Sequence, residues 1–166
     1  MTVSLRVAER RDAESIAEIY NYEVENTTAT FDLVPRTVDA QVEWLSARSG
    51  AFSAIVAEEN HSKVVGFAAL STYRDRAGYR TTVENSIYVH RDFHRRGIGR
   101  LLLSNLLEIA RDSGFHTVIA RIDSQSHGSL ALHRSLGFNE VGVEREIGRK
   151  FGRWLDSVIM QKILTN

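Results

Sequence analysis

The hydrophobic positions in the first half of the chain change from a period of two to a helical period and back. Alternation over 3–7 predicts a short strand, and Asp12 is a candidate N-cap for a helix that ends near Asn26. A threonine-rich loop over 27–36 precedes a second helix, which Thr37 can cap. Three strands then follow, over 51–57, 64–73 and 81–89, the first two joined by a hairpin turn at 59–62.

The second half begins with the clearest helix of the pattern. It starts at Gly97 and ends before Gly114, a suitable C-terminal stop. Its apolar stripe consists of Ile98, Leu101, Leu102, Leu106, Ile109 and Ala110. A strand over 117–122, a helix over 126–136 closed by Gly137, and two antiparallel strands over 140–147 and 154–162 complete the pattern. The order β-α-α-β-β-β-α-β-α-β-β predicts a mixed α/β architecture and one domain over residues 1–166.

The strand over 81–89 has two different faces. Val83, Asn85, Ile87 and Val89 share one face, and Glu84, Ser86 and Tyr88 share the other. Glu84 is therefore expected on the face opposite the branched residues.

Composition excludes several classes of protein. The 166 residues hold 21 Lys and Arg against 21 Asp and Glu, with 43% hydrophobic residues, which is typical of a globular domain and not of a disordered chain or a charge-dominated nucleic-acid binder. The chain has no cysteine, so it has no disulfide, thiolate nucleophile or zinc–thiolate site. The histidines show no ligand spacing, and we predict no metal. Without a signal peptide or a membrane-spanning apolar run, we expect a cytoplasmic protein with no membrane partner.

A short basic turn joins the strand ending at Val89 to the helix that starts at Gly97. Free N–H groups at a helix start, with glycines and Arg95, Arg96 and Arg100 nearby, can bind a pyrophosphate. Taken alone, the pattern also fits an ordinary solvated helix start. A dinucleotide fingerprint would need glycine at Leu102, and no Gly-Lys-Ser/Thr phosphate loop occurs, so neither NAD nor ATP is favoured.

Three segments together form a family pattern: Ile87-Tyr88-Val89, Arg95-Arg96-Gly97-Ile98-Gly99, and Ala131-Leu132-His133-Arg134-Ser135-Leu136-Gly137-Phe138. Through them the chain resembles the GNAT superfamily of acyl-CoA-dependent N-acetyltransferases over essentially its whole length. The chain looks most like the phosphinothricin and methionine sulfoximine acetyltransferase group. That subgroup match rests on Thr30-Phe31, Arg76, Tyr79, the run 84–89, Gly152-Arg153-Trp154 and Asp156. The implied fold is a mixed sheet splayed between two parallel strands, with helices on both faces.

The resemblance implies acetyl-CoA as co-substrate. Its pantetheine arm would pair with the strand at Ile87, Tyr88 and Val89. Its diphosphate would lie on the helix start, at Arg95, Arg96, Gly97, Ile98, Gly99 and Arg100. Ser126 and Ser135 would approach the cofactor from the next helix. His94 and Ser126 depart from the residues that the superfamily more often has, Gln or Arg and Asn respectively.

The resemblance also assigns catalytic roles. Glu84 would be the general base, the Val89 N–H would polarise the thioester carbonyl, and His133 would protonate the thiolate, where many relatives use tyrosine. A glutamate on a strand is more often simply solvated, and His133 also fits a structural histidine. Phe31, Arg76, Gly78 and Tyr79 would bind the acceptor.

The expected reaction is direct acetyl transfer to the α-amine of a small amino acid or analogue, such as phosphinothricin, methionine sulfoximine or methionine sulfone. A protein N-terminus or a polyamine is the alternative acceptor, and a non-catalytic acyl-CoA sensor is a further alternative. Related members imply a homodimer. No nucleic-acid partner is expected, because the basic residues gather at the helix start and do not form a broad stripe.

Overall fold

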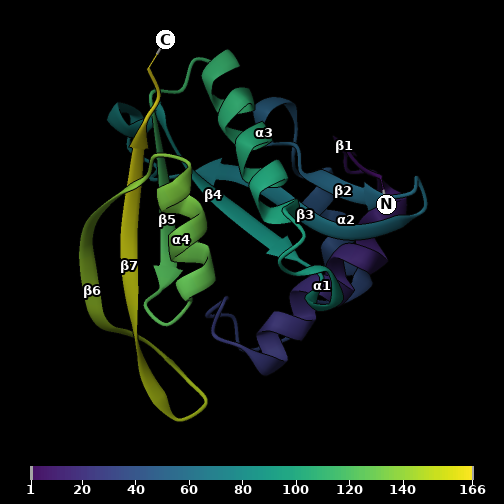
Figure 1. Ribbon diagram of the computed structural model, residues 1–166, viewed down its shortest axis with the longest axis horizontal. Helices are drawn as coiled ribbons and strands as arrows, with labels where there is room; N and C mark the ends of the chain where they lie inside the picture. Colours follow the sequence, from purple (N-terminus) through teal and green to yellow (C-terminus); the bar gives the residue numbers. More distant parts are fainter. Residues whose placement is uncertain (1, 166) are drawn as a thin grey trace.

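A computed structural model describes residues 2–165, which form one twisted seven-stranded sheet in the order β1-β2-β3-β4-β5-β7-β6 (Figure 1). The strands are β1 (Val3–Val7), β2 (Ile55–Glu59), β3 (Lys63–Thr72), β4 (Thr82–Val89), β5 (Thr117–Asp123), β6 (Asn139–Lys150) and β7 (Arg153–Ile163). The helices are α1 (Ala13–Asn26), α2 (Val38–Ser46), α3 (Ile98–Asp112) and α4 (His127–Ser135). The predicted order of elements and the mixed α/β class are confirmed.

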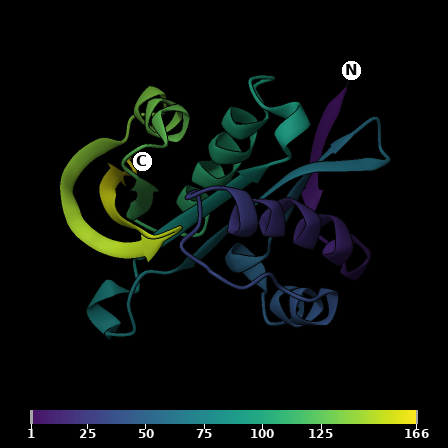
Figure 2. The same cartoon turned by 90° about the horizontal axis from the view of Figure 1, so that it is seen from below.

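Helices cover both faces of the sheet, as Figure 2 shows. On one face, α3 and α4 pack with buried residues such as Leu102, Leu106 and Leu130 against the centre of the sheet. On the other face, α1 packs Ile16 and Ile19 against β2 and β3, with α2 beside it. The amphipathic stripes of the helices thus bury the sheet on both sides.

The strands β4 and β5 run parallel and are paired over only three residues. Thr82, Val83 and Glu84 pair with residues 117–119, and beyond Glu84 the ladder between the two strands ends. The other neighbouring strands are antiparallel. This confirms the predicted splay and leaves one edge of β4 without a partner strand from Asn85 onward.

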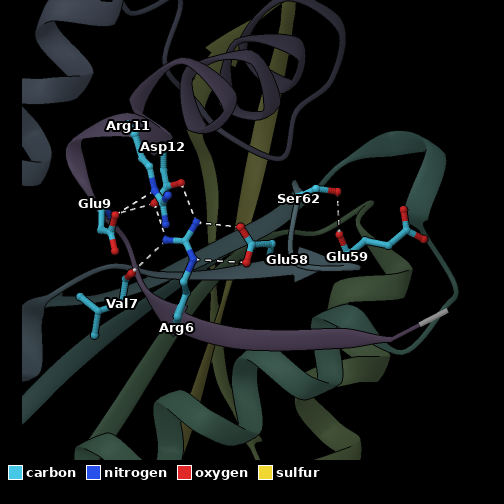
Figure 3. A network of polar contacts seen from close by, with 8 residues as sticks. All are labelled: Arg6, Val7, Glu9, Arg11, Asp12, Glu58, Glu59 and Ser62. Carbon is cyan, nitrogen blue, oxygen red and sulfur yellow. Dashed lines mark hydrogen bonds and ion pairs between the residues drawn. The ribbon is translucent and has the colours of Figure 1, made fainter.

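Asp12 stands at the N-cap position of α1, as predicted, but its side chain makes other bonds. Its carboxylate caps no N–H of α1 and instead accepts from the Glu9 N–H at 2.7 Å and from the Arg6 guanidinium at 2.7 and 2.9 Å (Figure 3). Arg6 also binds Glu58 on β2 at 3.0 Å. The buried carboxylate therefore joins β1, β2 and the start of α1, because a bidentate ion pair outweighs a single cap bond.

Two further predictions were wrong in detail. The strand predicted from Ala51 begins at Ile55, because 50–52 forms a 3-10 turn and Arg48 binds the Phe52 carbonyl at 2.9 Å. Leu101 is exposed, whereas Leu103 and Leu107 are buried. At 3.6 residues per turn, Leu101 lies on the side of α3 that faces away from the sheet. The predicted caps at Thr37 and Gly114 are confirmed by the bond from the Ala40 N–H to Thr37 and by the positive φ of Gly114.

Candidate active site

A cavity of about 790 Å³ occupies the gap between β4 and β5. Its walls come from the loop after α1, from β4 and β5, from the first turns of α3 and α4, and from the β6–β7 hairpin. Arg95 and Arg100 lie at one end, which we call the basic end. At the other end, the acidic end, the lining carboxylates are Glu23, Glu84, Asp123 and Glu144, with the single guanidinium of Arg121.

The unpaired edge of β4 presents backbone groups to this cavity. The His90 N–H donates to the Val65 carbonyl on β3 at 2.8 Å, so the ladder to β3 uses every second residue of β4. The N–H groups of Ile87 and Val89 therefore point the other way, toward the gap. On that side the Val89 carbonyl is bonded to His94 Nε2 at 2.8 Å. An extended ligand can pair with β4 here in the manner of an added strand.

The basic end is built by the turn before α3. Arg95 and Gly97 both have positive φ, +62° and +80°, and Gly97, the N-cap residue of α3, has no side chain that could cap the N–H groups of the first turn. A Cβ at Gly99 would lie 3.2 Å from the Leu132 side chain, so glycine lets α3 start close to α4. Uncapped amides, the helix dipole and two arginines make this end a site for an anion such as a diphosphate.

The predicted cofactor residues are mostly together at this end. Those that line the cavity are Ile87, Tyr88, Val89, Arg95, Gly97, Ile98, Gly99, Arg100 and Ser126. Ser135 does not line it but accepts a hydrogen bond from Arg100 at 3.0 Å, and Arg96 lies over the Phe93 ring at 4.8 Å. His94 lines the cavity and fastens the end of β4 through its bond to Val89.

Glu84 lies at the acidic end, on the face of β4 that the alternation predicted. Arg121 Nε is 3.7 Å from Glu84 Oε2, and the same guanidinium is hydrogen-bonded to Glu144. Burial raises the pKa of Glu84, Arg121 lowers it and Glu144 raises it, so that the pKa lies above its ordinary value. A carboxylate with a raised pKa is a stronger base than a solvated one.

Four charged residues of the acidic end were not predicted from the sequence: Glu23, Arg121, Asp123 and Glu144. Arg121 and Asp123 both interrupt the apolar run of β5 and share one face of it, a signal that alternation could have revealed. Asp123 is 5% exposed, and its Oδ2 accepts from the Thr28 hydroxyl, while its Oδ1 has no hydrogen-bond partner within residues 2–165. Glu144 gave no such signal, because it is one of several charged residues on β6.

His133 lines the same cavity as Glu84 and contacts Asn85, the next residue of β4. It is 3% exposed, its Nδ1 is 2.8 Å from the Ser129 carbonyl and its Nε2 is 3.0 Å from Asn85 Nδ2. A carbonyl only accepts, so Nδ1 carries a proton and Nε2 accepts from the Asn85 amide. Burial lowers the pKa of His133, and the Ser129 carbonyl opposes this without reversing it. The contacts are those of a neutral imidazole.

The residues predicted to bind the acceptor lie in two places. Phe31 lines the acidic end. Arg76, Gly78 and Tyr79 form a turn before β4 and are not among the described residues that line the cavity. The other missed lining residues include Ser129, Leu132, Ile147 and Ser157.

Residues 2–165 contain neither a cluster of metal ligands nor a membrane-spanning helix. No three side chains of His, Asp or Glu there are grouped closely enough to hold a metal ion. In the same residues, no helix has the length and apolar character needed to cross a bilayer.

A splayed parallel pair, with a basic helix start at one end of the gap and a half-buried glutamate at the other, is the kind of site that an acyl-group transferase needs. A family model described as "Acetyltransferase (GNAT) domain" matches residues 5–159. The chain therefore belongs to the GNAT acetyltransferase family.

Its relatives include amino-acid acetyltransferases. The L-amino acid N-acyltransferase MnaT of Escherichia coli is 44% identical over 161 residues, 96% of this chain and 92% of the relative. The L-methionine sulfoximine/L-methionine sulfone acetyltransferase of Salmonella typhimurium is 40% identical over 96% of this chain and 93% of its own length.

Solved structures agree in fold. A phosphinothricin acetyltransferase from Sinorhizobium meliloti in complex with acetyl-CoA has a TM-score of 0.94 and 39% identity, covering 99% of this chain and 89% of that one. A ribosomal-protein-alanine N-acetyltransferase from Brucella melitensis has a TM-score of 0.94 and 41% identity, covering 97% and 99%.

Proposed function

We propose that the protein transfers an acetyl group from acetyl-CoA to the α-amine of a small amino acid or analogue. Phosphinothricin, methionine sulfoximine and methionine sulfone are the candidate acceptors. The observation that carries the proposal is that the separation of β4 from β5 joins the basic end and the acidic end in one cavity. Because both ends belong to one cavity, donor and acceptor can be bound together, and direct transfer in a ternary complex is part of the proposal.

Acetyl-CoA would occupy the basic end and the edge of β4. The outward N–H groups of Ile87 and Val89 would pair with its pantetheine arm, and the amides of residues 95–100 would hold its diphosphate, with Arg95, Arg96 and Arg100 as counter-charges. Ser126 lines the same end, and Ser135 would act through its bond to Arg100. Two backbone features thus fix the position of the thioester.

The acidic end would receive the amine. Four carboxylates against one guanidinium favour a cationic group there, and an acceptor ammonium is cationic until it loses a proton. Glu84 would take that proton, directly or through water. A peptide α-amine, with a pKa of about 7.8, gives up its proton far more readily than a lysine amine at about 10.4, and the pKa of a free amino acid's α-amine lies between the two because of its own carboxylate. A glutamate with a raised pKa therefore suits an α-amine.

The bond changes are those of thioester aminolysis. The neutral amine nitrogen attacks the thioester carbon, and the developing oxyanion is stabilised by the Val89 N–H. The carbonyl then re-forms as the carbon–sulfur bond breaks, the nitrogen releases its second proton to solvent, and the departing thiolate takes one proton. We propose His133 as the proton donor, as the resemblance implies. It would donate from the form that carries protons on both ring nitrogens, and this requires the hydrogen bond between Nε2 and Asn85 to break.

A protein N-terminus is the second candidate acceptor, which the name of the Brucella neighbour favours. Its α-amine has the same chemistry as that of an amino acid. The wall formed by Phe31 and the β6–β7 hairpin at the acidic end favours a small acceptor over a polypeptide. A polyamine would fit the acidic charge but offers amines of higher pKa. A non-catalytic acyl-CoA sensor would need no base, and Glu84 argues against it.

We also propose that the protein is a homodimer. The edge strand β6 and its neighbour expose Val141, Val143 and Trp154, which a second copy would cover. The turn that carries Arg76, Gly78 and Tyr79 lies outside the cavity of its own chain, so its part in acceptor binding would arise near a subunit boundary.

The test is release of CoA thiol from acetyl-CoA across a panel of acceptors. We expect turnover with methionine sulfoximine, methionine sulfone or phosphinothricin, and much less with polyamines and N-terminal peptides. Turnover of peptides or polyamines alone would overturn the small acceptor and keep the cofactor site. Binding of acetyl-CoA without turnover of any amine would leave the sensor function in its place.

A further inference from the structure

Lys150, at the end of β6, is a buried ammonium that the proposed chemistry does not use. It is 3% exposed, and its Nζ donates to the Thr30 carbonyl at 2.8 Å and to the Glu23 carbonyl at 3.2 Å. Both acceptors are backbone atoms at least 120 residues away in sequence. Lys150 therefore connects the β6–β7 hairpin to the end of α1 and to the loop that follows it.

Burying this ammonium is unfavourable by itself. Burial lowers the pKa of Lys150, although Asp32 and Glu23 oppose the effect. The two partners are neutral carbonyls, which are weaker partners for a cation than a carboxylate in direct contact. If the lysine were absent, both carbonyls would lack this donor. Its contribution lies in the position of the loop.

That loop forms part of the acidic end. Ala29, Thr30 and Phe31 line the cavity, and the Tyr20 hydroxyl is 2.9 Å from the Thr30 hydroxyl, which holds the loop from the side of α1. Thr28 is held from β5 by its hydrogen bond to Asp123. Lys150 adds the attachment to the hairpin.

The hairpin and the loop also meet at Gly148. A Cβ at this position would lie 2.6 Å from Phe31 Cδ2, so the Phe31 ring packs directly on the backbone of β6. Two residues further along the same strand, Lys150 fixes the Thr30 carbonyl. The ring and the carbonyl next to it are thus both placed by β6, which also contributes Glu144 to the acidic end.

We propose that Lys150 is a positioning residue of the acceptor site. It touches neither acceptor nor cofactor, and it sets the distance of the Thr30–Phe31 wall from Glu84. The proposal rests on the proposed function, because it takes the acidic end as the place where the amine binds. It assigns no role to Lys150 at the basic end.

The experiment compares the steady-state kinetics of Lys150→Met with those of Lys63→Met. Lys63 is a matched control, because its ammonium lies 4.9 Å from the centre of the Phe93 ring and that of Lys150 lies 5.1 Å from the centre of the Phe151 ring. Lys63 is exposed, and among the described residues it binds no loop carbonyl. We expect Lys150→Met to raise the KM for the acceptor about 10- to 100-fold, with the KM for acetyl-CoA unchanged. An unchanged acceptor KM, or an equal rise in both KM values, would overturn the proposal.

Lys150→Gln keeps an N–H donor, but on a shorter side chain that cannot span both carbonyls. It tests the positioning role of Lys150 if Lys150→Met does not fold. We expect the same one-sided rise in KM, smaller in size. An acceptor KM equal to that of the wild type would contradict the role of Lys150.

Hydrogen exchange separates this proposal from the proposed function. Amides of residues 27–32 should exchange faster in the Lys150 variants than in Lys63→Met, with acetyl-CoA absent and no turnover needed. Unchanged exchange would overturn the positioning role. If the wild type acetylates none of the amines while this difference in exchange is present, the proposed function fails and the attachment of the loop stands.

Discussion

The two ends of the cavity are built in different ways. The basic end is mainly backbone: N–H groups of the β4 edge and of the first turn of α3, supplied by the short stretch 87–100. The acidic end is made of side chains from five separate parts of the chain, represented by Glu23, Glu84, Asp123, Glu144 and the loop residue Phe31. A site built from a contiguous backbone segment leaves a motif in the sequence, and a site built from scattered side chains does not.

The difference also predicts how each end responds to substitution. Backbone amides remain when a side chain changes, so the basic end is disturbed chiefly by altered backbone conformation or by added charge. At the acidic end each side chain has its own partners, and one carboxylate can carry the proton transfer. We therefore expect the largest loss of activity from a substitution at the acidic end.

Glu84→Gln should lower kcat/KM about 10²- to 10⁴-fold, the range usual for loss of a general base. In the wild type, kcat/KM should fall with decreasing pH as Glu84 is protonated, at a higher pH than for an ordinary glutamate because its pKa is raised. In the variant, the fall in kcat/KM at low pH should no longer follow the protonation of Glu84 but that of the amine, which must lose its proton unaided. The pH optimum should therefore move upward. Initial rates across pH measure both effects.

The free energy of unfolding of Glu84→Gln distinguishes loss of the general base from loss of the folded structure. Folding raises the pKa of Glu84, so its favourable contribution belongs to the protonated form at low pH and is lost as the pH rises through the folded-state pKa. At pH 7 to 8 the free energy of unfolding of Glu84→Gln should equal or exceed that of the wild type. Glu140→Gln, an exposed carboxylate on β6 that pairs with Arg134, is the control for activity. Wild-type rates in Glu84→Gln would remove Glu84 as the base.

Gly97→Asp should raise the KM for acetyl-CoA about 10- to 100-fold, because a carboxylate would face the proposed diphosphate. Gly97 has a φ of +80° and open space around its Cβ position, so the substitution adds backbone strain and charge without a clash. Gly97→Asn is the matched control, with nearly the same shape and strain but no charge. Equal cofactor affinity in the two folded variants would refute the placement of the diphosphate.

His133→Gln should have the smallest effect, a decrease in kcat of less than about tenfold. The thiol of the leaving group has a pKa of about 8.5, so the thiolate is weakly basic and departs with little help from an acid. Glutamine can offer an oxygen to Asn85 in place of Nε2 but has no titratable proton. A loss as large as that of Glu84→Gln, at equal thermal stability, would show that proton donation limits the rate.

The sequence alone was sufficient to predict the order of helices and strands, the start of α3 and the face of β4 on which Glu84 lies. Each depends on local periodicity or on a glycine-bearing turn, and the structure agrees within a few residues at Val3–Val7, Thr82–Val89 and Ile98–Asp112. The exceptions, such as Leu101 and the late start of β2, arose where tertiary contacts override a local pattern.

The acidic end could be predicted only in part. Glu84 and Phe31 were found through the family resemblance, whereas Arg121, Asp123 and Glu144 lie on strands whose pairing brings them together across the sheet. The sequence by itself determined the elements and the backbone site of this protein, because both follow from neighbouring residues. Only the tertiary structure decided which distant side chains share the cavity and which buried lysine holds its wall, because these contacts depend on strand order and packing.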